Sequence, residues 1–115
     1  MTNKKLIHKQ IAEIVPVLTG HGIGAKKVLI SQEELSSPIT QIAQTTLRRG
    51  DIVVTHKHPT MDEHFIFLEG ECELTLNETK ICCKGGEYLL IPAGVRHQIE
   101  VISDTTMITV GVAKE

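Results

Sequence analysis

The chain has 115 residues, 41% of them hydrophobic, and a formal net charge of −2, which fits one globular domain with one core. The small charge gives no electrostatic reason to expect nucleic acid or an anionic membrane as a partner. No stretch approaches the ~18 consecutive apolar residues of a membrane span, and no signal-peptide core is present, so we expect a cytoplasmic protein. Aromatic residues make up only 3%, so Ile, Val, Leu and Ala are expected to build the core.

The first element in chain order is a helical candidate over residues 5–15, which Pro16 ends. Its apolar residues recur at helical spacing: Ile7, Ile11, Ile14 and Val15. An extended arm that packs on a partner explains the same pattern, so both alternatives stay open. The glycine-rich stretch 20–24 follows; it lacks the Lys-Ser/Thr ending of a phosphate loop, and we interpret it as a flexible connector.

From Gly24 onward the chain consists of predicted strands separated by turn residues. Apolar and β-branched runs occupy residues 26–31, 39–47, 51–58, 64–70, 72–76, 80–83, 88–92, 97–102 and 106–112. No helical pattern of about 10–15 residues lies between them, which argues against a parallel α/β sheet. Many short strands at this spacing predict an all-β antiparallel sandwich or barrel.

The stretch "HKHPTMDEHFIFLEG", residues 56–70, contains two histidines and a glutamate that are candidate metal ligands. Alternate side chains of a strand share a face, so His56 and His58 are expected to face inward together while Lys57 points away. Two neutral imidazoles suit a metal ion but suit an apolar core poorly, because each leaves a ring nitrogen that needs a partner. The turn at "PTM" can then bring the Glu63 carboxylate back beside the two rings.

A third imidazole comes from "GEYLLIPAGVRHQIEV", residues 86–101, in which His97 opens a strand after a tight turn. Three nitrogens and one oxygen form a ligand set that suits Zn, Fe, Mn, Ni, Co or Cu better than Mg²⁺ or Ca²⁺. We therefore expect one divalent transition metal ion, with a metal-free or degenerate site as the alternative. The expected ligands are His56, His58, Glu63 and His97.

These two segments resemble the two signature motifs of the cupin superfamily. The first, Gly, five residues, His-x-His, three or four residues, Glu, six residues, Gly, is matched at every position from Gly50 to Gly70. The second, Gly, five residues, Pro-x-Gly, two residues, His, three residues, Asn, is matched from Gly86 to His97, with Val101 in place of the Asn, which has no ligand role in the family. The resemblance implies metal ligands at the four residues above. It also implies turn residues at Gly50, Gly70, Gly86, Pro92 and Gly94.

The resemblance further implies a small β-barrel or double-sheet jelly roll over residues 25–115, preceded by an arm or short helix over residues 1–24 that packs on the barrel or a partner subunit. Small single-domain cupins commonly form homodimers. The outer face of the strand after Glu63, with Ile66 and Leu68, is apolar and fits such a contact.

The cupin fold hosts oxygenases, isomerases, epimerases, decarboxylases, sensors and storage proteins, so it constrains function weakly. We expect a protein that binds and transforms a small oxygenated metabolite, with sugar or keto-acid isomerisation slightly favoured. The alternatives are a metal-dependent dioxygenase, a non-enzymatic small-molecule sensor, and a scaffold for a partner protein.

Several neighbouring side chains have a competing structural interpretation. The inward-facing apolar residues expected to contact substrate, or simply to pack, are Phe65, Phe67 and Ile99. Alternation turns His64 to the opposite face, so we do not expect it to be a ligand. His21 is expected to be exposed, and the pair Lys26-Lys27 to be solvated surface.

Overall fold

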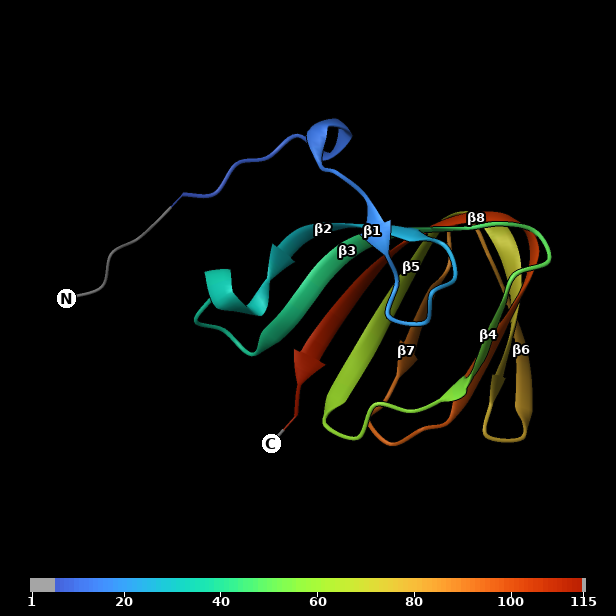
Figure 1. The fold of residues 1–115 in the computed structure, drawn as a ribbon. Helices are drawn as coiled ribbons and strands as arrows, with labels where there is room; N and C mark the ends of the chain where they lie inside the picture. The colour runs from blue at the N-terminus through green and yellow to red at the C-terminus, as the bar shows by residue number, and fades with distance from the viewer. Residues whose placement is uncertain (1–5, 115) are drawn as a thin grey trace.

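The computed structural model describes residues 6–114, and these are almost entirely β-structure (Figure 1). The strands are β1 (Val17–Leu18), β2 (Ala25–Ser31), β3 (Ile39–Leu47), β4 (Ile52–His56), β5 (Met61–Leu76), β6 (Thr79–Lys84), β7 (Tyr88–Ile91) and β8 (His97–Ala113). Single-turn 3-10 helices occupy Ile11–Glu13 and Gln32–Glu34. Every strand pairing is antiparallel, so the all-β prediction is confirmed.

Two long strands, β5 and β8, run through both layers of the fold (Figure 1). In one layer, residues 61–67 of β5 pair with residues 107–113 of β8; β7 extends this layer on one side, and β3, β2 and β1 extend it on the other. In the other layer, residues 69–76 pair with residues 97–106, flanked by β6 and β4. This is a double-sheet jelly roll. Within the described residues, the strand path runs from β1 to β6 without returning, so the barrel stays open.

The bend between the two layers occurs at Gly70. The pairing of β5 with β8 shifts register between Phe67 and Cys72, as β-bulges do where a strand changes direction. Gly70 has a φ of 94°, and a Cβ there would lie 2.3 Å from the Asp104 carbonyl oxygen. Only glycine fits such a position without displacing the facing backbone.

Continuity through these bulges explains a difference from the sequence prediction. The runs 64–70 and 72–76 are one strand, and so are 97–102 and 106–112, because the residues between them stay in the ladder instead of forming turns. The strand predicted over 51–58 ends at His56.

The helix considered over residues 5–15 does not form in its described part, from residue 6 onward; residue 5 lies outside the described residues. Only Ile11–Glu13 make a single turn, between extended residues Gln10 and Ile14. Short helices are stable mainly when an apolar face is buried, and here Ile11 is 40% exposed and Val15 is 78% exposed. The described part of the segment is therefore mostly extended, and its packing on a partner stays a prediction. No helix within residues 6–114 is long and apolar enough to span a membrane.

The core lies between the two layers and is mainly aliphatic, as expected. Its buried aliphatic members are Ala43, Leu47, Val53, Leu74, Ile91, Ile99 and Val101. Both phenylalanines, Phe65 and Phe67, together with Met107 and two cysteines, complete it. Both phenylalanines are therefore core residues, whereas Tyr88, the third aromatic residue, is 58% exposed.

Replacing Gly70 by Ala should lower the free energy of unfolding by about 2–4 kcal/mol, because strain at positive φ adds to the clash with backbone. Gly86→Ala is the matched control: its φ is 90°, but a Cβ there meets nothing within 4 Å. That control should cost only about 1 kcal/mol. Urea unfolding of the two variants measures the difference, and equal losses would contradict a steric role for the bend.

Candidate metal centre

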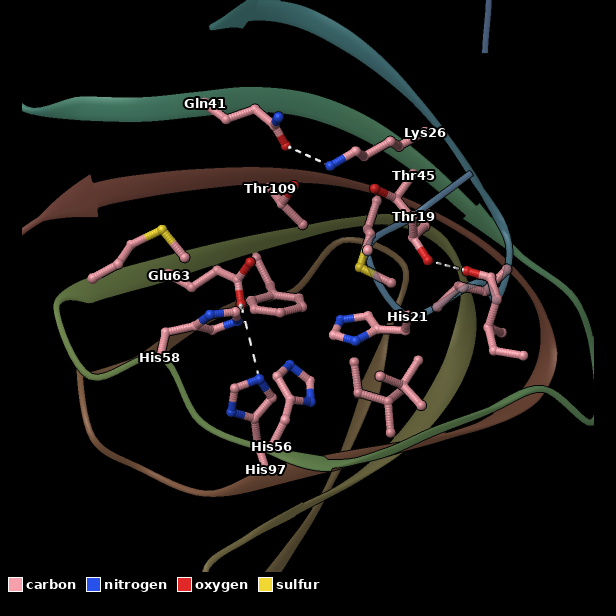
Figure 2. A pocket seen from close by; sticks show the side chains of 18 of the residues that line it. Thr19, His21, Lys26, Gln41, Thr45, His56, His58, Glu63, His97 and Thr109 are labelled. Carbon is pink, nitrogen blue, oxygen red and sulfur yellow. Dashed lines mark hydrogen bonds and ion pairs between the residues drawn. The ribbon is translucent and has the colours of Figure 1, made fainter. Parts of the chain in front are cut away.

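A cavity of about 360 Å³ lies among β2, β3, β4, β5 and β8 (Figure 2). Its size falls at the lower end of small-molecule sites in proteins. The apolar part of its wall comprises Ile23, Leu47, Val53, Met61, Phe65, Ile99 and Met107. The ionisable side chains on its wall are His21, Lys26, His56, His58, Glu63 and His97. All four predicted ligands therefore line one cavity.

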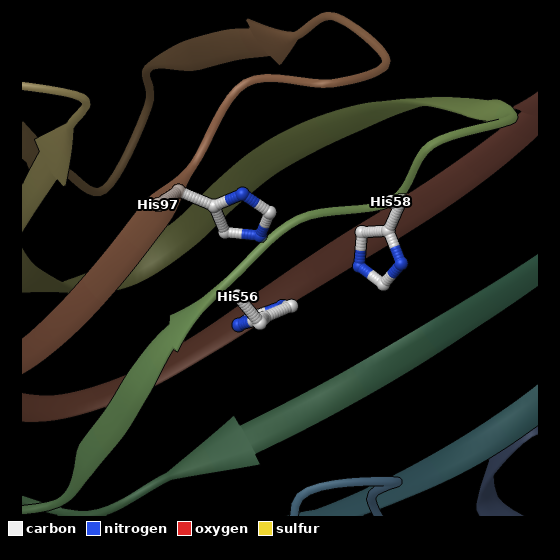
Figure 3. Close-up of side chains that lie close together, drawn as sticks. All are labelled: His56, His58 and His97. Atoms are coloured by element: carbon white, nitrogen blue, oxygen red, sulfur yellow. The ribbon is translucent and has the colours of Figure 1, made fainter.

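Three histidines converge at this cavity (Figure 3). One ring nitrogen from each of His56, His58 and His97 lies within 4.8 Å of the others. His56 ends β4, His97 begins β8, and the two residues are direct cross-strand partners, which places their ring centroids 4.1 Å apart. His58 follows in the loop after β4, with its ring centroid 5.0 Å from that of His56.

Hydrogen bonds to the backbone orient two of the rings. His56 Nδ1 lies 2.9 Å from the Val54 carbonyl oxygen, and His97 Nδ1 lies 3.1 Å from the Val95 carbonyl oxygen. A carbonyl oxygen only accepts, so each Nδ1 donates a proton and each Nε2 keeps its lone pair free. His97 is 1% exposed, and its Nε2 has no hydrogen-bond partner within residues 6–114. Burying an acceptor without a partner costs free energy, and a metal ion bound to Nε2 would remove that cost.

The Glu63 carboxylate lies beside two of the rings. Its Oε1 is 3.6 Å from His58 Nε2 and 3.9 Å from His97 Nε2, although Glu63 is not part of the mutually close histidine set. Burial raises the pKa of Glu63 to about 7, and the positive charge of Lys26 opposes that rise. A cation at the rings would stabilise the ionised carboxylate, so the donor set fits a divalent ion.

The protonation states of the histidines also fit metal binding. Burial lowers the pKa of His97 to about 4, against the hydrogen bond to Val95 and with help from the charges of the neighbouring histidines. Burial, and then the charge of His56, lower the pKa of His58. Metal ligation requires neutral imidazole, and these shifts favour that form near neutral pH.

The two motifs are tied together by backbone contacts next to the site. Gly94 N donates to the His58 carbonyl oxygen at 2.9 Å, and Ala93 N donates to the Asp62 carboxylate at 2.8 Å. The turn that leads to His97 is therefore fastened to the loop that carries His58.

Of the other residues expected near the site, some line the cavity and others do not. Phe65 and Ile99 line the cavity, but Phe67 does not. Phe67 lies in the core with its ring centroid 6.1 Å from that of Phe65, because two residues along a strand carry it roughly 6.6 Å further. His64 points to the opposite face, where its Nδ1 lies 2.7 Å from the Tyr88 hydroxyl.

Two ionisable residues of the cavity wall, His21 and Lys26, were not predicted as site residues from the sequence. His21 is exposed as expected, yet its ring centroid lies 4.2 Å from that of His56. Its loop is a closed turn rather than a free connector, because Thr19 Oγ1 donates to the Ile23 carbonyl oxygen at 2.6 Å. Lys26 is half-buried and lines the cavity, so the solvated-surface prediction was wrong for it. Strand alternation was the available signal, since neighbouring lysines on a strand point to opposite faces.

Together, these features define an all-β protein with a histidine-rich cavity between two sheets. Residues 43–112 match the model of the cupin domain, and the chain belongs to the cupin family. Among curated proteins it is similar to an uncharacterized protein, MJ1618, of Methanocaldococcus jannaschii: the two are 28% identical over 108 residues, which cover 93% of this chain and 85% of that one.

Solved structures share the fold at low identity. A predicted oxalate decarboxylase from Thermotoga maritima has a TM-score of 0.82 at 24% identity, covering 93% of this chain and 99% of its own. Ectoine synthase from P. lautus has a TM-score of 0.82 at 16% identity, covering 96% and 80%. KdgF from Halomonas sp. has a TM-score of 0.74 at 13% identity, covering 90% and 91%. At these identities the likeness concerns the fold alone.

Metal affinity should fall as the pH is lowered below about 7. The pKa of Glu63 is raised to about 7, so below that pH the free protein holds a proton that an incoming cation must displace. Calorimetry at pH 6 in two buffers of different ionisation enthalpy counts the protons released on zinc binding. Glu63→Gln should bind zinc more weakly and release about one proton fewer; an unchanged count would contradict this role.

Proposed function

We propose that this chain is a cupin metalloprotein that binds one divalent transition metal ion and transforms a small oxygenated metabolite in the adjacent cavity. The proposed ligands are His56, His58, Glu63 and His97. Within this class we favour non-redox chemistry, namely isomerisation of a sugar or keto-acid.

The observation that carries the proposal is the state of His97 Nε2. It is buried, it has no hydrogen-bond partner among the described residues, and the Nδ1 of the same ring is held by a carbonyl. A core histidine with only a structural role normally satisfies both nitrogens. Here the unsatisfied nitrogen belongs to a ring within 4.1 Å, centroid to centroid, of a second ring oriented in the same way.

The cavity walls support binding of a small polar molecule. When bound, a divalent ion would polarise a carbonyl or hydroxyl oxygen of that molecule. The apolar side chains of Val53, Phe65 and Ile99 would exclude water around it. His21 is the imidazole on the wall outside the proposed ligand set; partial burial at the cavity, and then the charge of His56, lower its pKa, which favours the neutral ring that can accept a proton.

We also propose that the chain pairs as a homodimer through the outer face of β5 and β7. Ile66 and Tyr88 are cross-strand neighbours there and are 40% and 58% exposed. Leu90 and Leu68 extend the apolar surface and are 40% and 51% exposed. A second copy would remove this surface from water.

His58→Ala should reduce the bound metal well below one ion per chain and remove most of the thermal stabilisation that metal provides, because the ion binds the folded state preferentially. Elemental analysis and thermal melts with and without a chelator measure the two effects. His64→Ala is the matched control, since it removes the same side chain from the opposite face. Absence of stoichiometric metal in wild-type protein reconstituted with each candidate ion would contradict the proposal.

The favoured chemistry is tested with the protein loaded with zinc or manganese. Incubation with aldoses, ketoses and 2-keto-acids, followed by NMR, should show conversion of one class without oxygen consumption. Oxygen consumption by the iron-loaded or copper-loaded protein would support the dioxygenase alternative instead. Ligand-induced thermal stabilisation without any product would support the sensor.

A further inference from the structure

One ammonium group, that of Lys26, lies on the cavity wall away from His56 and His97. Lys26 reaches into the cavity from β2, and Figure 2 shows it on the opposite side from His56 and His97. Its Nζ donates to Gln41 Oε1 at 3.1 Å, which uses one of its three N–H groups. The chain thus presents an ammonium group with unused donors to the inside of the cavity.

No carboxylate of the described residues pairs with this ammonium. The ion pairs within residues 6–114 involve Lys9, His58, Lys80 and His97, and none involves Lys26. Glu63 is the acidic side chain on the cavity wall, and its carboxylate contacts the histidines instead. A half-buried cation without a protein anion is stabilised by an anionic ligand.

The surroundings of Lys26 favour a small, singly charged anion. Lys26 is the cross-strand partner of Thr45, whose side chain is 8% exposed and lines the same wall, as does Thr109. Gln41, held by Lys26, lines the wall as well. One ammonium balances one negative charge, and the neighbouring hydroxyl and amide groups supply hydrogen bonds to the oxygens of a carboxylate.

We propose that the cavity selects small carboxylic acids that carry a second oxygen, with the carboxylate on Lys26 and the hydroxyl or carbonyl oxygen toward the histidine cluster. This assignment rests on the proposed function for the second oxygen only. It divides recognition between two walls: Lys26 sets the charge of the ligand, and the histidine wall receives the oxygen at which reaction occurs.

The experiment compares acids with their neutral amides. Lactate and lactamide, glycolate and glycolamide, and pyruvate and pyruvamide are titrated by calorimetry into the zinc-loaded full chain. We expect at least one acid to bind about tenfold or more tightly than its amide. If no acid in the set binds more tightly than its amide, the proposal is overturned.

Substitutions at Lys26 test whether this residue causes the preference for acid over amide. Lys26→Gln should abolish the preference for acid over amide while the protein still binds one zinc ion per chain, and Lys26→Arg should retain the preference. Lys27→Gln is the matched control: Lys27 is the next residue of the same strand, and its Nζ contacts the Ile11 carbonyl oxygen outside the cavity. A preference that survives in Lys26→Gln overturns the assignment.

The two proposals fail in different ways. If the wild-type chain holds no zinc but still prefers acids through Lys26, the metal function fails and the carboxylate site stands. If zinc binds stoichiometrically and acid and amide bind alike, the carboxylate site fails and the metal function stands.

Discussion

The pairing of β4 with β8 is the constraint on which the site depends. It makes His56 and His97 cross-strand partners, so residues far apart in the chain have ring centroids 4.1 Å apart. Carbonyl oxygens two residues before each histidine then hold both Nδ1 atoms, which leaves both Nε2 atoms free.

Electrostatics link the cavity walls to this pair. Burial lowers the pKa of His97 and of His58 and raises the pKa of Glu63, so without a cation these three groups carry less charge than they would in water. A divalent ion at the histidines would favour the ionised form of the Glu63 carboxylate. On the far wall Lys26 supplies a fixed positive charge, and its field already opposes the rise in the pKa of Glu63. With a divalent ion at the histidines, the cavity would carry positive charge on two opposite walls and would suit an anion that bridges them.

Much of the fold could be predicted from the residues alone. The glycines expected at turns, Gly50, Gly70, Gly86 and Gly94, all adopt positive φ, which is the conformation their motif positions require. Strand positions were predicted well because hydrophobic runs and turn residues are local signals. The continuity of strands through the bulges was not predicted, because a glycine in a bulge and a glycine in a turn look alike in sequence.

The sequence by itself determined the all-β class and predicted four candidate ligands, because motif spacing and strand alternation are local features of the residue order. Only the tertiary structure decided that His21 and Lys26 share the cavity with them, and that Phe67 does not. Those placements depend on the loop between β1 and β2, on the position of β2 beside β3, and on depth along β5. Contacts between residues far apart in the chain decide which side chains line the cavity, and the local periodicity of the sequence does not specify those contacts.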